Sequence, residues 1–309
     1  MSDYHISVLL DETVRALSPK SGGIYFDGTL GGGGHTQAIL DYATGTRTIS
    51  TDLDGHAIAH VSDRLGLDCK YDGRFDLVLS DFREVACVLD RLKVDKIDGA
   101  ILDLGISSYQ IDTPDKGFSY RLDGPLDMRM SMTEGVTAFE VINKYPTERL
   151  TKILFEYGEE RFSRRIVSNI DKARSVKPIE TTLELVDIIR KSVPNNPKDG
   201  HPAKRVFMAV RIEVNGELTG LDTAVESIVS RLKSGARLAV ITFHSLEDRI
   251  IKRAFARLAT DCLCDKSHPI CVCKHTKEAK LIKKCRPSAA EIAGNKRSKS
   301  AMLRVLEKV

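Results

Sequence analysis

The sequence has 309 residues, of which 42% are hydrophobic, enough to bury the core of one large domain or two ordinary ones. No apolar run approaches the roughly 20 residues that cross a bilayer, and the first residues lack the basic and then apolar layout of a signal peptide, so we expect a globular cytoplasmic protein and no membrane partner. The formal net charge of +4 is too small to establish a nucleic-acid partner.

The first third of the chain alternates segments that favour strands with segments that favour helices. Strands are expected at residues 24–27, 48–52, 75–79 and 99–103, and helices at residues 36–42 and 57–65. Because parallel strands joined by helices need right-handed crossovers, this alternation predicts a doubly wound α/β sheet. Ligands of such sheets bind beyond the carboxyl ends of the strands.

The alternation stops after residue 103. Gly and Pro residues break the segment 109–145, and apolar residues then recur at helical spacing over 150–157, 162–170 and 185–189. The sheet pattern resumes with a helix over 218–232, a strand at 237–243 and terminal strands near 281–283 and 302–306. We therefore expect a sheet domain in two parts, residues 1–110 and 209–309, with a smaller helical domain at residues 111–208 between them.

Four consecutive glycines lie between the first expected strand and the first expected helix, just before His35 and Thr36. A tight turn there lets backbone N–H groups and the helix N-terminus approach a ligand, although a purely structural turn is the alternative. Asp52 ends the second expected strand about 20 residues downstream, the usual position of a carboxylate that binds ribose hydroxyls. Together these features predict a ligand that contains adenosine.

The dinucleotide fingerprint fits the turn badly, because Thr36 stands where a third glycine or alanine should pack against the strand. Asp27, at the end of the first strand, is expected beside the ligand, where it would repel a pyrophosphate. A sulfonium and an amino group would instead be attracted by that carboxylate. Charge complementarity therefore favours S-adenosylmethionine over NAD or ATP.

The C-terminal part of the chain has two unusual compositions. Basic residues heavily outnumber acidic ones from Lys274 to Lys308, which suits contact with phosphates, although a solvated basic surface is equally compatible.

Five of the seven cysteines follow residue 260, and an odd total does not suit a secreted disulfide framework. Four of these cysteines form two close pairs: Cys262 with Cys264, and Cys271 with Cys273. This arrangement predicts either a structural zinc site or a reduced, exposed loop.

Longer motifs resemble a known family. Four segments are similar to those of bacterial 16S ribosomal RNA cytosine-N4 methyltransferases: DLGISSYQ (103–110), GPLDMRM (124–130), YGEER (157–161) and FHSLEDR (243–249). Residues 5–10 and 295–301 extend the resemblance over nearly the whole chain. The resemblance implies a Rossmann-like class I methyltransferase sheet with a helical insertion. It further implies methylation of the exocyclic amine of one cytidine in the decoding region, with the small ribosomal subunit and its 16S rRNA as partner and no DNA.

The same resemblance assigns residues to the cofactor. By motif matching, the cofactor would contact Gly33, Gly34, His35, Asp52, Phe82, Asp103 and Gln110. Asp103 is also the expected catalytic residue, because an acceptor for N4–H helps the amine lone pair to localise toward the methyl carbon. Related amino-methyltransferases carry two prolines and an aromatic residue at this strand end, whereas residues 103–106 carry neither. Contact of Asp103 with the amine and contact with the cofactor therefore both stay open.

Substrate contacts are expected on three parts of the chain. Aromatic and charged side chains of the Gly- and Pro-broken segment would stack on an extruded base or read its edge, unless the aromatics simply anchor the insertion. Arginines of the insertion, and the segment after the fifth strand, would position RNA, with Ser245 and Asp248 capping a helix. These expected substrate residues are Tyr109, Phe118, Asp127, Arg129, Arg205, Arg211, His244, Asp248 and Arg249.

Two other functions are compatible with a chain of this kind. One is an NAD-dependent oxidoreductase, which Thr36 and the lack of a recognisable hydride-transfer site disfavour. The other is a non-catalytic ribosome-assembly factor that binds rRNA. Free rRNA and an assembled subunit are both compatible substrates, and a monomer and a dimer are both compatible states.

Overall fold

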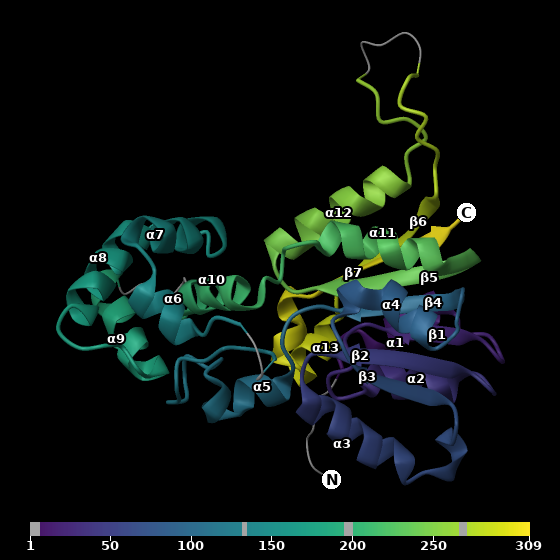
Figure 1. The fold of residues 1–309 in the computed structure, drawn as a ribbon, viewed down its shortest axis with the longest axis horizontal. Coiled ribbons are helices and arrows are strands. Elements are labelled where there is room, and N and C mark those ends of the chain that lie inside the picture. The colour runs from purple at the N-terminus through teal and green to yellow at the C-terminus, as the bar shows by residue number, and fades with distance from the viewer. Residues whose placement is uncertain (1–6, 132–134, 195–199, 266–270) are drawn as a thin grey trace. The chain divides into compact units, whose positions relative to one another are not determined.

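The computed structural model describes residues 7–131, 135–194, 200–265 and 271–309. It forms two compact units, shown in Figure 1. Unit 1 consists of residues Met1–Gly105 and Gly220–Val309, and unit 2 of residues Ile106–Thr219. None of the helices in these ranges is long and apolar enough to cross a membrane.

Unit 1 is built on a mixed sheet with the strand order β3-β2-β1-β4-β5-β7-β6. The strands are β1 (Ile24–Asp27), β2 (Arg47–Asp52), β3 (Phe75–Leu79), β4 (Ile97–Asp103), β5 (Leu232–Thr242), β6 (Ala279–Cys285) and β7 (Met302–Lys308). Strands β1 to β5 pair in parallel, which confirms the doubly wound α/β expectation. One edge of the sheet is antiparallel, because β7 pairs antiparallel with both β5 and β6.

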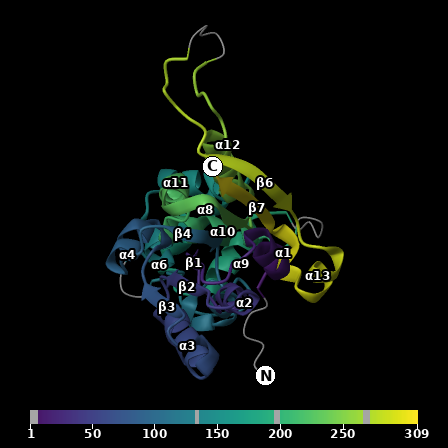
Figure 2. The same ribbon diagram turned by 90° about the vertical axis from the view of Figure 1, so that its right-hand side faces the viewer.

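Helices cover both faces of this sheet, as Figures 1 and 2 show. Successive strand residues point to opposite faces, so Phe26 packs with the helices of one face and Tyr25 with those of the other. The first face carries α4 (Val85–Arg91), α11 (Leu221–Arg231) and α12 (Ser245–Leu258), and the second carries α1 (Leu10–Leu17) and α2 (Gly34–Tyr42). The remaining elements are α3 (Gly55–Gly66), η1 (Cys69–Tyr71), η2 (Phe82–Glu84), α13 (Ala289–Gly294) and η5 (Lys296–Ser300).

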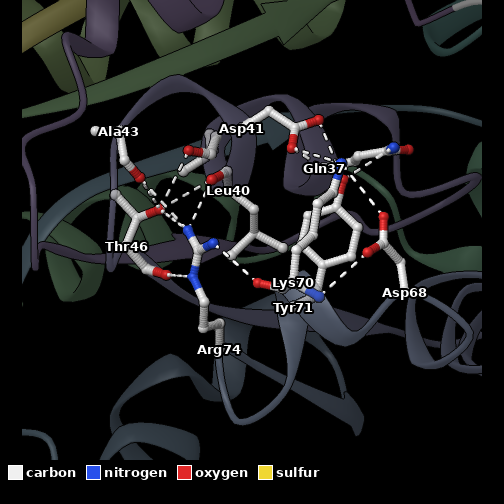
Figure 3. A network of polar contacts seen from close by, with 10 residues as sticks. Gln37, Leu40, Asp41, Ala43, Thr46, Asp68, Lys70, Tyr71 and Arg74 are labelled. Carbon is white, nitrogen blue, oxygen red and sulfur yellow. Dashed lines mark hydrogen bonds and ion pairs between the residues drawn. The ribbon is translucent and has the colours of Figure 1, made fainter.

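A polar network fixes the C-terminal end of α2. Figure 3 shows the Arg74 guanidinium donating to the carbonyl oxygens of Leu40 and Thr46, at 2.7 and 2.9 Å. The Tyr71 hydroxyl donates to Asp41 on the same helix at 2.9 Å. Because the last carbonyls of a helix have no partner within the helix, the bond to Leu40 satisfies one of them, and the network holds α2 against the segment before β3.

Unit 2 is helical. It contains α5 (Ser108–Asp112), η3 (Pro114–Lys116), α6 (Ala138–Lys144), α7 (Thr147–Glu156), α8 (Ser163–Arg174), α9 (Thr182–Ser192) and α10 (Lys204–Asn215). The expected boundary at residue 208 falls inside α10, whose side chains Val206, Phe207 and Val210 are buried in the core of unit 2. Helix α10 therefore belongs wholly to the insertion, which begins at Ile106 and ends at Thr219.

Candidate functional site

The glycine turn joins the end of β1 to the start of α2. Gly31 and Gly33 adopt left-handed backbone angles, with φ of 49° and 72°, and Gly33 is the N-cap of α2. The Gly31 N–H donates to Oδ2 of Asp52 at 2.8 Å, and the Leu30 N–H donates to the Thr51 carbonyl at 2.9 Å. Asp52, the last residue of β2, therefore holds the turn at the carboxyl edge of the sheet, where sequence analysis expects it.

Part of the glycine run is required by the protein's own packing. A Cβ atom on Gly33 would lie 2.8 Å from Val61 and 2.9 Å from Nη2 of Arg64, and one on Gly34 would overlap the Ser7 side chain. A Cβ atom on Gly31 would instead face open space, with only the Thr29 carbonyl at 4.0 Å. The structural interpretation of the turn thus accounts for the absence of side chains at Gly33 and Gly34, whereas the space beside Gly31 is open.

Three carboxylates end adjacent parallel strands. Asp27, Asp52 and Asp103 are the last residues of β1, β2 and β4, and β1 pairs with both other strands. Asp27 is only 1% exposed; its Oδ2 accepts from the Thr36 hydroxyl at 2.7 Å and its Oδ1 from the Thr29 N–H at 3.1 Å. The protein itself uses both oxygens of Asp27, as it does those of Asp52, so the expected position of Asp27 beside the ligand stays a prediction.

Asp103 has an acceptor atom that the protein leaves unused. Its Oδ2 lies 3.7 Å from Nδ1 of His35, whose side chain is 5% exposed. Its Oδ1 is buried and has no hydrogen-bond partner among the described residues, while its backbone N–H donates to the Thr29 hydroxyl at 2.6 Å. The backbone of Asp103 is therefore fixed, and one carboxylate oxygen remains available to a bound molecule.

Burial changes the acidity of these three groups. Loss of hydration raises the pKa of Asp27 to about 6 and raises the pKa of Asp52. Burial also raises the pKa of Asp103 well above its usual value, and repulsion from Asp27 and Glu247 adds to this shift. A positive charge brought beside these carboxyls would relieve the repulsion, so the strand ends favour a cationic ligand.

Phe82 lies at the same edge as the strand ends. It begins η2, three residues after the end of β3, and is partly buried against the core of unit 1. A Cβ atom on Gly28 would lie 2.8 Å from the Phe82 Cβ atom, which places Phe82 beside the residue that follows β1. Its position beyond a strand end agrees with the expected contact to an adenine ring, which stays a prediction.

Arg64 is a candidate that sequence analysis did not identify. Its Nε and Nη2 atoms are buried without a hydrogen-bond partner in the part of the chain that the structure describes. Burial lowers the pKa of this guanidinium, and its Nη2 atom approaches Gly33. The available signal was an arginine on the apolar face of α3, three residues after the buried Val61 and next to the buried Leu65.

The corner between β5 and α12 has a structural role that differs from the expected one. The N-cap of α12 is His244, not Ser245: His244 Nδ1 accepts from the Glu247 N–H at 3.4 Å, and Glu247 accepts from the His244 N–H at 3.3 Å. Asp248 is bound by Arg304 through two hydrogen bonds of 2.7 and 2.8 Å. The expected Ser245 and Asp248 cap is therefore wrong, because α12 begins at Ser245 itself, one residue too early for Ser245 to precede the helix as its cap. Arg249 is exposed.

The expected residues of unit 2 divide into buried and exposed groups. Phe118 is 6% exposed in the helical core, which supports its alternative role as an anchor, and Gln110 is buried in a capping box with Ser107. Tyr109 is partly buried, with Lys116 Nζ 5.8 Å from the centre of its ring. These contacts explain the fold of the segment and leave the expected roles of Tyr109 and Gln110 as predictions.

Charged residues of unit 2 show a similar division. Arg129 binds Asp127 through hydrogen bonds of 2.9 and 2.8 Å. Burial alone would raise the pKa of Asp127, but the bonds from Arg129 hold it below its usual value. Arg211 binds Glu217 through two bonds of 2.8 Å, and its side chain is only 14% exposed, so it does not lie on an open basic surface as expected. Arg205 is exposed and keeps that possibility.

The sequence of this chain is similar to those of known proteins. The profile of the MraW methylase family matches residues 2–309. Proteins named ribosomal RNA small subunit methyltransferase H, from a Geobacter species and from Clostridium botulinum, are each 48% identical to this chain over 315 and 313 residues, covering 100% of both chains. A crystal structure of an rRNA methylase from Streptococcus thermophilus is 14% identical with a TM-score of 0.40, covering 97% of this chain and 93% of that one.

Proposed function

Since its sequence matches the family profile over residues 2–309, the chain belongs to the MraW methylase family, and we propose that it transfers a methyl group from S-adenosylmethionine to N4 of one cytidine in the decoding region of 16S rRNA. The ribosomal RNA part of the proposal is supported by the names of relatives that are 48% identical over their full length. The cytosine-N4 part is supported by the motifs at residues 103–110 and 243–249. The proposed substrate places the reaction in the cytoplasm.

The strand ends fit this cofactor chemically. S-adenosylmethionine carries a sulfonium and an amino group, both cationic, and the structure offers the unused buried oxygen of Asp103 beside carboxyls whose pKa is raised by burial. Asp52 would hold the ribose hydroxyls, Phe82 would cover the adenine, and Arg64 is a buried cation suited to the carboxylate of the methionine end. The backbone of Gly33 and Gly34, with His35 and Gln110, would complete the contacts. When bound, the cofactor supplies an electrophilic methyl group.

In this proposal Asp103 acts on the amine of the cytosine. The N4 lone pair is shared with the ring, so an acceptor for the N4–H hydrogen bond makes the nitrogen a better nucleophile. The fixed backbone of Asp103 orients this acceptor before the substrate arrives. During the transfer, Asp103 would accept the hydrogen bond from the amine of the cytosine, and the amine proton would then pass to solvent. Most of the rate acceleration would come from the in-line placement of the two reacting atoms.

RNA would be bound by exposed arginines and by an aromatic residue. Four arginines of unit 2 are exposed and suited to phosphate contacts: Arg161, Arg164, Arg165 and Arg205. Tyr109 would stack on the extruded cytosine, and His244, Asp248 and Arg249 would position the strand. Asp127 and Arg129 would present their paired charges to the base or its backbone, and Arg211 would act indirectly, through its pair with Glu217.

A methyl-transfer assay tests the proposed function. The purified protein is incubated with S-adenosylmethionine and with either 30S subunits or free 16S rRNA prepared from cells that lack the enzyme, and the RNA is mapped by mass spectrometry. We expect one methylated cytidine, on N4, in at least one of the two substrates. Binding of rRNA without methyl transfer would support the assembly-factor alternative, and calorimetric binding of NAD instead of S-adenosylmethionine would support the oxidoreductase.

The affinity for the cofactor is expected to depend on pH. Because burial raises the pKa of Asp27 to about 6, this carboxyl loses negative charge as the pH falls through about 6, and the pKa of Asp103 is also raised well above its usual value. A cationic ligand prefers the ionised carboxyls, so its affinity should rise with pH through this range and binding should release protons. Calorimetry at several pH values, in buffers of different ionisation enthalpy, measures both effects. An affinity that is flat from pH 5 to pH 8, without proton release, would contradict the assignment.

In the unbound protein, the raised pKa of Asp27 should make the stability fall as the pH rises. An aspartate whose folded pKa is raised binds more protons in the folded state than in the unfolded state between about pH 4 and pH 6. Asp27 therefore contributes a loss of stability as the pH rises through this window, and a bound cation should reverse that loss. Thermal unfolding with and without S-adenosylmethionine is the corresponding control.

A further inference from the structure

The connection between α12 and β6 leaves the body of unit 1 as a long loop. Its base is closed by a hydrogen bond from the Glu278 N–H to the Leu258 carbonyl at 2.9 Å and by a contact of 3.0 Å between His275 Nε2 and the Arg257 carbonyl. Beyond this base the chain projects away from the sheet in both ribbon views (Figures 1 and 2). Leu263 and Val272 are 46% and 70% exposed there, so the described part of the loop has no apolar core of its own.

Four cysteine sulfurs meet at this place in the loop. The Sγ atom of Cys271 lies 3.3 Å from that of Cys262 and 3.6 Å from that of Cys273, and the Sγ atoms of Cys273 and Cys262 are 3.8 Å apart. Every pair among these three sulfurs and that of Cys264 lies within 4.8 Å. The two C-x-C segments are thus brought together so that each sulfur faces several others, and the sulfurs do not separate into two isolated pairs.

Backbone donors point at these sulfurs. The Leu263 N–H donates to Cys273 Sγ at 3.3 Å, and the Val272 N–H donates to Cys264 Sγ at 3.3 Å, so each segment donates to the other. Within the first segment, the Cys264 N–H donates to Cys262 Sγ at 3.4 Å. Hydrogen bonds of this kind favour the thiolate over the thiol, and the thiolate is the form that binds metals.

We propose that Cys262, Cys264, Cys271 and Cys273 bind one structural zinc ion. With a Zn–S distance of about 2.3 Å, a tetrahedral site places its sulfurs roughly 3.8 Å apart, which is close to the separations observed. Four thiolates fill the coordination shell and leave no open position for a substrate, so the ion has a structural role. It would hold the two halves of a loop that lacks a core, as metals do in small domains.

Metal analysis of the intact protein tests this inference. The full chain is purified without chelators, reduced, loaded with zinc under anaerobic conditions and passed through a desalting column before elemental analysis. We expect about one zinc per chain in the wild type and a loss of at least tenfold in the double variant Cys271→Ser and Cys273→Ser. Cys69 and Cys87 are exposed cysteines outside the loop, so the variant Cys69→Ser with Cys87→Ser is the matched control and should keep its zinc.

Cobalt(II) gives a second readout that does not depend on enzymatic activity. Cobalt in place of zinc should show the intense visible absorption of a tetrahedral thiolate site, and the double variant in the loop should lose this absorption. A reduced wild-type protein that retains neither zinc nor cobalt would overturn the proposal. So would iron with the absorption of an iron–sulfur cluster, or a protein in which only three of the seven cysteines react under denaturing, non-reducing conditions, because two disulfides would then occupy the four thiols.

Discussion

Replacing Asp103 by asparagine is expected to lower the rate of methyl transfer by a factor of about 100 to 10,000 while the fold stays intact. Asparagine keeps the size of the side chain and the backbone bond to Thr29, but it is a weaker acceptor for the amine and carries no charge. Because Asp103 is buried and repelled by Asp27 and Glu247, removal of its charge should leave the melting temperature unchanged or raise it. Loss of activity without loss of stability would be the signature of a functional residue.

The measurement is single-turnover methyl transfer at saturating S-adenosylmethionine, combined with thermal unfolding and cofactor binding. Asp63, an exposed carboxylate on α3, is the control, and Asp63→Asn should leave all three quantities unchanged. A variant Asp103→Asn that binds the cofactor weakly but transfers methyl groups normally at saturation would assign Asp103 to the cofactor alone. Near-normal turnover and normal cofactor binding together would remove it from the mechanism.

Gly33→Ala is expected to destabilise the protein by roughly 2–5 kcal/mol and to abolish cofactor binding at moderate concentrations. A left-handed backbone costs a residue with a Cβ atom about 1–2 kcal/mol. In addition, the new methyl group would lie within 3 Å of Val61 and Arg64, and overpacking of this kind costs roughly 1–3 kcal/mol. Since Gly33 is the N-cap of α2, the strain would displace the turn that approaches the ligand.

Gly73 offers a matched control for this substitution. It has a similar φ of 67°, but a Cβ atom there meets nothing within 4 Å. Gly73→Ala should therefore cost only the backbone contribution of about 1–2 kcal/mol and should leave cofactor binding unchanged. Chemical denaturation of both variants, with calorimetric titration of S-adenosylmethionine, separates the two contributions. Equal destabilisation of the two variants would mean that contact with Val61 and Arg64 is unimportant.

The sheet was predictable where local pattern and topology agree. Residues 24–27 and 75–79 are the bounds of β1 and β3 as predicted, because short, largely apolar runs between turns leave few alternatives. Their order then places Asp27, Asp52 and Asp103 at one edge, since the carboxyl ends of parallel strands meet there. The direction of β7 was not predictable, because a strand of alternating or apolar residues has the same pattern whether it pairs parallel or antiparallel.

The sequence does not reveal which charged side chains of the site pair with each other. Asp248 and Arg304 are 56 residues apart, and nothing in either local segment indicates that they bind each other. Arg211 and Glu217 are only six residues apart, yet the bond between them forms only because the chain turns at Gly216, beyond the end of α10. Charged residues that look available in a sequence are thus often paired in the fold. Arg64 is the opposite case, because no motif marks it, yet two of its nitrogen atoms have no hydrogen-bond partner among the described residues.

The position of β7 has a consequence for the synthesis of this protein. β7 follows every other strand in the chain, yet it lies inside the sheet, between β5 and β6. Before β7 is available, β5 is therefore an edge strand and β6 has no partner in the sheet, and their free backbone groups invite pairing with other chains. Chaperone protection during this interval, and rapid degradation of prematurely terminated products, would follow directly from that order of assembly.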